Sequence, residues 1–330
     1  MSVTANYIKW SLGDSFAGRL KRNLSFQVGA IIVTIYLIIS LLDFIDPKYL
    51  GVSNAFNLFS FSNPGIRSVL MKQPSPPTTN EGLLYLLGTT AYGIPILPAI
   101  LASIPVDLGF AVLIAGVSAT IGTFIGVSGA FLTKKLEWVI SFVSNTFISI
   151  PIIISVLIFG FLLHFTLFAI SIGIIAVLWA YYAQIARMLT LNIKGNQFIE
   201  AARASGASDL RIVYSHVFPN IATPVLIRFS LDIATVIMIF SATNFLFWQQ
   251  FTPLATTPEL GALINGFPEF GYLFGFHLVG SQYIPATASL FLYMGYWWTV
   301  FFPVLFLLIL VIGLIALSDG MRKALDPRTT

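Results

Sequence analysis

The most distinctive residue spacing lies in a polar segment, residues 190–223, between two long apolar stretches. Residues 198–204 favour a helix, Gly206 can adopt the left-handed conformation that ends one, and Ser208 is a good N-cap for a second helix. Apolar residues recur at helical spacing behind this cap, at Leu210, Val213, Tyr214 and Val217. Pro219 is expected to stop the second helix. The segment therefore predicts a short helix-turn-helix that could transmit motion from a soluble partner, with a helix lying at the lipid interface as the alternative.

Catalytic chemistry is not indicated by the remaining polar residues. The three histidines, His164, His216 and His277, have no metal-binding spacing, and the chain contains no cysteine. We find no Ser/His/Asp arrangement and no paired carboxylates on one helix face. The sequence also contains no Gly-x-x-x-x-Gly-Lys-Ser/Thr stretch for binding nucleotide phosphates. We therefore expect a chain that is not an enzyme, without catalytic residues, a bound metal or a cofactor of its own.

The composition indicates a membrane protein. Of the 330 residues, 57% are apolar and 9% are charged, whereas a soluble domain has about 45–50% apolar and about 25% charged residues. The net charge of +4 is too small and too scattered to indicate a nucleic-acid partner. Six stretches are apolar and long enough to cross a bilayer of about 30 Å, which predicts an all-α multi-pass protein of the cell membrane. The predicted spans are 27–44, 108–132, 138–163, 167–189, 224–247 and 298–317.

The orientation follows from the distribution of Lys and Arg. With the N-terminus in the cytoplasm, thirteen of the 17 basic residues lie on the cytoplasmic side, which places the C-terminus there as well. The predicted connections are a cytoplasmic amphipathic tail (1–26), an extracellular loop (45–107), the cytoplasmic loop 190–223, a second extracellular loop (248–297) and a cytoplasmic tail (318–330). Residues 108–189 carry the second to fourth spans.

Polar residues inside the predicted spans are candidates for a solute pathway, because they are costly to place in a bilayer. Arg228 and Asp232 are four residues apart and can form an ion pair on one helix face, or act in a pathway or gate. The other candidates could instead form ordinary hydrogen bonds between helices. The candidate pathway residues are Asn145, Arg228, Asp232, Ser241, Thr243 and Asn244.

Two features concern the shape of the spans. Gly122-x-x-x-Gly126 permits the close approach of another helix, either within the chain or from a partner subunit. Pro151 is expected to kink the third span.

The polar segment carries a resemblance to a known family. Glu200-Ala201-Ala202, followed by Gly206 and Pro219 at their present spacing, resembles the EAA loop of permease subunits of binding-protein-dependent ABC importers. The chain is most similar to the C-type permease of dipeptide and oligopeptide importers, to which oligosaccharide and nickel-chelate importers are related. Four further segments resemble family motifs, in the same order: Arg19–Asn23, Leu87–Gly93, Pro258–Gly261 and Ser318–Arg328.

This resemblance implies a function and a set of partners. Residues 108–317 would be the permease core, paired with a homologous second permease and with two cytoplasmic ABC ATPase subunits that hold ATP and Mg²⁺. An extracellular binding protein would deliver the solute, a peptide, oligosaccharide or metal chelate. The alternative is a secondary transporter or channel driven by an ion gradient. The residues implied at the ATPase contact and its helix-turn-helix are Glu200, Ala201, Ala202, Gly206, Ser208, Asp209, Leu210 and Pro219.

Overall fold

A computed structural model describes residues 16–45, 75–79, 85–90, 95–164, 166–247, 259–265, 277–279, 282–284 and 297–325. The first half of the predicted cytoplasmic tail, most of the two predicted extracellular loops and residues 326–330 lie outside them.

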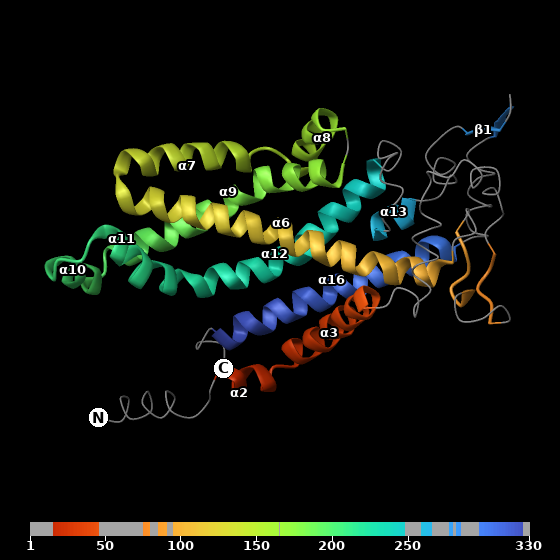
Figure 1. Cartoon of the computed structure of the whole chain (residues 1–330), viewed down its shortest axis with the longest axis horizontal. Helices are drawn as coiled ribbons and strands as arrows, with labels where there is room; N and C mark the ends of the chain where they lie inside the picture. The colour runs from red at the N-terminus through yellow and green to blue at the C-terminus, as the bar shows by residue number, and fades with distance from the viewer. Residues whose placement is uncertain are drawn as a thin grey trace.

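The described chain is a bundle of long helices (Figure 1). The long helices are α3 (Leu24–Ile45), α6 (Ile96–Leu132), α9 (Leu167–Lys194), α12 (Phe218–Phe247) and α16 (Trp298–Leu325). The shorter helices are α2 (Phe16–Arg22), α7 (Lys134–Ile148), α8 (Ile152–Leu162), α10 (Gln197–Ala204), α11 (Asp209–Ile212), the π-helix η2 (Val213–Val217) and α13 (Leu260–Asn265). One antiparallel hairpin joins β1 (His277–Val279) and β2 (Gln282–Ile284). Within the described ranges, five helices are long and apolar enough to cross a membrane, or six spans are present if α7 and α8 count as one bent span. The prediction of an all-α multi-pass membrane protein is confirmed, with this hairpin as a small addition.

The elements are sorted between the two ends of the bundle. Figure 1 shows α10 and α11 at one end, together with α2 and the C-terminal end of α16, whereas α13 and β1 lie at the opposite end. We call the first the inner end and the second the outer end, following the predicted orientation. Helices α6 and α9 pack along each other, α3 packs on α16, and α12 contacts both α6 and α16.

Small residues set the close approach of α6 and α9. A Cβ atom at Gly122 would clash with the carbonyl oxygen of Trp179, and one at Gly126 would clash with that of Ala183. Both glycines therefore serve packing within the chain, which decides between the two alternatives that the sequence left open.

The predicted third span, 138–163, is broken rather than kinked. Helices α7 and α8 meet at an angle of 86°, and Pro151 stands directly before α8. Proline has no N–H to continue the α-helical hydrogen bonding, and it disfavours helical geometry at the preceding residue, here Ile150. The prediction of a single continuous helix was wrong, although the position of the distortion was correct.

Helix α6 begins at Ile96, twelve residues before the predicted start of the second span at Leu108. Residues 96–107, which the sequence placed in the extracellular loop, form its outer part. Pro105 lies inside the helix, and Asp107 is buried there.

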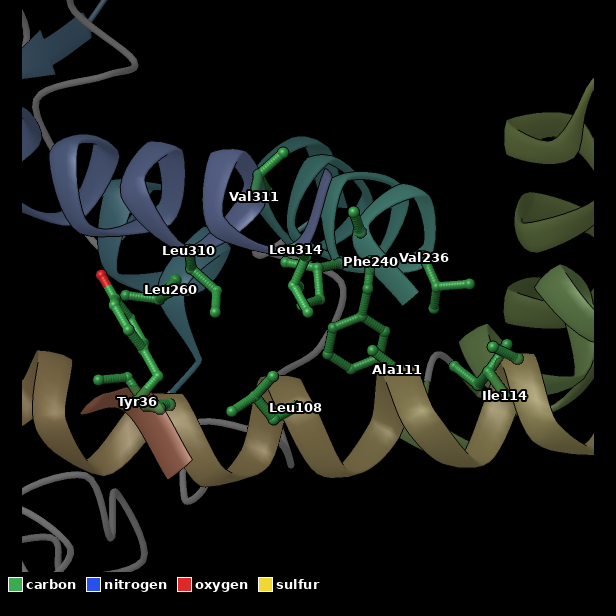
Figure 2. Packing of buried hydrophobic residues seen from close by; sticks show 14 of the residues in the cluster. Tyr36, Leu108, Ala111, Ile114, Val236, Phe240, Leu260, Leu310, Val311 and Leu314 are labelled. Carbon is green, nitrogen blue, oxygen red and sulfur yellow. The ribbon is translucent and has the colours of Figure 1, made fainter. Parts of the chain in front are cut away.

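The main core fills the outer and middle parts of the bundle. Figure 2 shows the ring of Phe240 from α12 directed toward α6 at Ala111, while Leu260 of α13 lies near Leu310 of α16. Phe240 also stacks on Phe110, with 5.4 Å between ring centroids. Helix α13 is thus anchored among the long helices through its apolar side chains.

Candidate functional site

The segment between α9 and α12, predicted to be cytoplasmic, folds as the predicted helix-turn-helix at the inner end. Helix α10 ends at Ala204, and Gly206 adopts the left-handed conformation with φ = +82°. The side chain of Ser208 accepts a hydrogen bond from the backbone N–H of Arg211, which caps α11. Arg203 and Asp209 approach to 3.5 Å across the turn. We call residues 197–217 the inner hairpin.

The inner hairpin is fixed to the bundle by its own small core. Ile199 of α10, Ile212 of α11 and Val217 of η2 are fully buried. They form one cluster with Phe131 of α6 and Ala186 of α9. Displacement of the hairpin would therefore be resisted by two long helices.

Basic side chains strengthen this attachment at the end of α6. Lys194 donates hydrogen bonds to the carbonyl oxygens of Ala130 (3.0 Å) and Phe131 (2.9 Å), which lie in the last turn of α6. A positive charge is favourable at the C-terminus of a helix. The guanidinium group of Arg203 lies over the ring of Phe131, 5.4 Å from its centroid.

The opposite face of the inner hairpin is exposed and partly apolar. Leu210 is 68% exposed and Tyr214 is 61% exposed. Of the residues implied at the ATPase contact, Ala202 is half-buried and the others are exposed: Glu200, Ala201, Gly206, Ser208, Asp209, Leu210 and Pro219. The structure thus brings these residues together at the inner end, with most of the set on its surface.

The apolar face expected behind Ser208 is split between core and surface. Val217 is buried and Val213 is half-buried, but Leu210 and Tyr214 are exposed, while Ile212, outside the predicted face, is buried. The π-helix η2 explains the change. One π turn contains more residues than an α turn, so Ile212 and Val217, five residues apart, face the same core.

Pro219 does not stop the helix, contrary to the prediction. It lies in the first turn of α12, and residues 209–246 form one continuous helical stretch. A proline cannot donate to the carbonyl group four residues before it and would crowd that group in a regular α-helix. Here the wider π turn immediately precedes it, with the N–H of Phe218 bonded to the carbonyl oxygen of Val213. The inner hairpin is consequently continuous with α12.

An apolar groove of about 860 Å³ lies beside this junction, between the inner halves of α6 and α12. It is lined from α6 by residues 116–125, among them Gly116 and Phe124, and from α12 by residues 218–229, among them Pro219 and Phe229. None of the six candidate pathway residues lines this groove in the described part of the chain.

Arg228 and Asp232 form the predicted ion pair. Arg228 Nε lies 2.9 Å from Asp232 Oδ2, and the side chains are 38% and 1% exposed. The guanidinium group also lies over the ring of Tyr181 at 6.0 Å. The aspartate is therefore held inside the bundle by an arginine that remains partly accessible.

Asn145 lies on α7 and joins a polar chain to α9. Its side-chain oxygen accepts a hydrogen bond from Gln184 (2.9 Å), and Gln184 accepts one from Arg187 (3.2 Å). Arg187 in turn forms an ion pair with Glu137 at 2.9 Å. These contacts hold α7 against α9.

Ser241, Thr243 and Asn244 are buried in the outer half of α12. Thr243 and Asn244 bond back to backbone carbonyl groups one turn earlier. Ser241 and Asn244 lie beside the buried carboxyl group of Glu259, whose pKa is raised by burial to about 7 although these polar side chains oppose the rise. The sequence prediction missed both Glu259 and its neighbour Asp107 as candidate site residues.

Taken together, a bundle of helices long and apolar enough to cross a membrane, with an exposed hairpin continuous with one of them, defines a multi-pass membrane protein. Residues 118–330 match the family described as the binding-protein-dependent transport system inner membrane component, and the chain belongs to this family. This match and the relatives below confirm the resemblance to a C-type permease.

Curated relatives cover nearly the whole chain. It is 25% identical over 312 residues to a putative peptide transport system permease protein of Brucella abortus, which covers 94% of this chain and 90% of the relative. It is 26% identical over 317 residues to the dipeptide transport system permease protein DppC of Alkalihalophilus pseudofirmus (94% and 88%). It is 27% identical over 253 residues to the oligopeptide transport system permease protein OppC of Mycobacterium tuberculosis (74% and 77%).

Proposed function

We propose that this chain is the membrane permease subunit of an ATP-driven importer that takes up peptides delivered by an extracellular binding protein. ATP and Mg²⁺ would be held by two partner ATPase subunits. The peptide class rests on the names of the relatives, which are peptide, dipeptide and oligopeptide permeases. Oligosaccharide-like solutes are the second class to test.

The observation that carries the proposal is the inner hairpin. It exposes large apolar side chains at Leu210 and Tyr214, and it continues without a break into α12. Exposed apolar residues on a fixed element are suited to a protein contact. A partner that binds there can push on α12 directly.

The groove between α6 and α12 supports a second contact, with a homologous permease. Its lining is almost entirely apolar and contains Gly116, where the backbone is accessible to a close neighbour. A helix of the second permease would pack into this groove. The pathway would then lie between the two permeases rather than inside this chain.

Reconstitution in proteoliposomes tests the proposal. The chain is purified with its co-expressed second permease, ATPase subunits and binding protein, and uptake of labelled di- and oligopeptides is measured. We expect uptake that requires ATP and the binding protein and that persists when ionophores dissipate ion gradients. A matched complex with the ATPase active site inactivated is the control.

Three outcomes would overturn the proposal in different parts. Uptake by this chain alone, driven by an ion gradient, would indicate a secondary transporter. Uptake of oligosaccharides but not peptides would refute the substrate class alone. Failure of the chain to co-purify with any ATPase would refute the importer assignment.

A further inference from the structure

Two buried carboxyl side chains lie close together in the outer half of the bundle. Asp107 of α6 is 1% exposed, and Glu259, directly before α13, is 2% exposed. Asp107 accepts a hydrogen bond from the backbone N–H of Leu260, the residue next to Glu259, so the two carboxyl groups are close enough to interact. No Lys, Arg or His side chain of the described ranges pairs with either group. The neighbours from α12 are the neutral Ser241 and Asn244.

Two buried carboxyl groups that lie this close to each other cannot both keep a negative charge. Burial of one unpaired carboxylate already costs several kcal/mol, and adjacent carboxylates repel each other. At least one of the pair therefore carries a proton, and the hydrogen bonds indicate which one.

Both oxygen atoms of Glu259 already accept hydrogen bonds. Oε1 accepts from the backbone N–H of Gly261 at 3.1 Å, and Oε2 accepts from that of Ala262 at 2.7 Å. A proton on either oxygen would weaken one of these bonds. Glu259 is thus arranged as an acceptor, in its ionised form.

Asp107 has a different set of contacts. Its Oδ2 accepts from the backbone N–H of Leu260 at 3.2 Å, whereas its Oδ1 is fully buried and has no hydrogen-bond partner among the described residues. An O–H at Oδ1 would use this oxygen as a donor toward Glu259. We propose that Asp107 is a protonated carboxylic acid whose hydroxyl group donates to Glu259 and latches residues 259–265 onto α6.

The segment held by the latch, residues 259–265, also packs directly against the backbone of α12. A Cβ atom at Gly261 would clash with the backbone of Ser241, and Leu260 is fully buried in the main core. Residues 259–265 therefore connect the outer half of α12 to α6: Gly261 packs on the backbone of Ser241, and Asp107 accepts from the N–H of Leu260 and, in the proposed latch, donates to Glu259. Asp107 is a positioning residue for this connection, and its role in transport rests on the proposed function.

Infrared spectroscopy and a set of variants test the protonation of Asp107. Spectra are recorded on the purified complex above about pH 7, where Glu259 is ionised. We expect a carboxylic-acid C=O band in the wild type that shifts in D₂O and is lost in Asp107→Asn. The control Asp319→Asn, which removes an exposed carboxylate paired with Lys323, should keep the band.

Measurements of uptake and thermal stability in variants test whether Asp107 acts as a hydrogen-bond donor and Glu259 as an acceptor. Asparagine at position 107 supplies an N–H in place of the O–H and a carbonyl oxygen for Leu260, so Asp107→Asn should retain thermal stability and uptake within about twofold. Asp107→Leu should lose most uptake, because it fills the space without a donor. Glu259→Gln should also lose most uptake, since glutamine offers only one acceptor oxygen to two N–H groups.

The outcomes separate this inference from the proposed function. A wild-type spectrum without the acid band, or an Asp107→Asn variant as impaired as Asp107→Leu, would overturn the protonated latch. The infrared result does not depend on the transported solute. Absence of peptide uptake together with a retained acid band would therefore count against the proposed function alone.

Discussion

Leu210 and Ile212 lie two residues apart in α11, and truncating them should affect different properties: partner binding for Leu210 and stability for Ile212. Leu210 is 68% exposed, whereas Ile212 is fully buried against α6 and α9. Complete burial of a leucine side chain is worth about 1.5–3 kcal/mol. A partner that covers the exposed part of Leu210 would therefore gain about 1–2 kcal/mol, which corresponds to about a 5- to 30-fold change in Kd.

The matched variants are Leu210→Ala and Ile212→Ala. Leu210→Ala should leave the melting temperature of the purified permease unchanged but weaken ATPase binding by this factor, because it removes contact surface only. Ile212→Ala should lower the stability of the inner hairpin by about 2–5 kcal/mol, because it creates a cavity. ATPase affinity is measured by titrating labelled ATPase subunits onto permease in nanodiscs, and stability by thermal unfolding.

The pair of results can refute the reasoning. If Leu210→Ala binds the ATPase like the wild type while Ile212→Ala unfolds at lower temperature, then the exposed face of α11 is not the contact. If both variants lower the melting temperature equally, then Leu210 is buried within this chain and the arrangement of the inner hairpin is wrong.

Three further predictions concern the bundle. Gly126→Leu should prevent folding, because its side chain would meet the backbone of α9. Gly116→Leu should fold but, by filling the groove, should reduce the amount of the second permease that co-purifies. Equal yields of the second permease with the two variants would contradict this prediction. Arg228→Gln should destabilise the chain by about 3–5 kcal/mol, because it leaves Asp232 buried without its cation. In a thermal unfolding assay, the double variant Arg228→Gln, Asp232→Asn should recover much of this loss. Because burial raises the pKa of Glu259 from 4.5 to about 7, ionising this group costs more in the folded chain than in the unfolded one, although its hydrogen bonds offset part of the cost. This cost is absent below pH 4.5 and is fully present above about pH 7, so stability falls as the pH rises through this range. The melting temperature should fall over this range in the wild type and less in Glu259→Gln, and equal pH profiles would exclude a raised pKa.

The parts of the fold that the sequence predicted best depend on local signals. Gly206 and Ser208 act through their own backbone and side-chain chemistry, so the turn and the cap of the inner hairpin follow from the sequence alone. The ion pair of Arg228 and Asp232 is likewise a property of one helix.

The errors arise where neighbouring segments decide the outcome. The π turn before Pro219 changes which residues of the second helix are buried, and no residue type in Val213–Val217 predicts this turn. The hydrogen bond between Asp107 and Leu260 joins positions 153 residues apart. The sequence therefore placed Asp107 in a loop, whereas it is buried in α6. Ser241 and Asn244 remain candidate pathway residues and lie buried beside Glu259.

The connection between α6 and α12 differs at the two ends of the bundle, and this difference bears on how the proposed importer would move. In the outer half the two helices are bridged by residues 259–265, whereas the apolar groove lies between their inner halves, which touch through the stacked rings of Phe124 and Phe218. A force applied to the inner hairpin enters α12 at the groove. We therefore expect a force large enough to overcome the small core of the hairpin to shift the groove-lining part of α12 relative to α6, while the bridged half stays in place. Cross-linking the inner halves across the groove should block uptake, but cross-linking α13 to α6 should not, because that contact is already fixed.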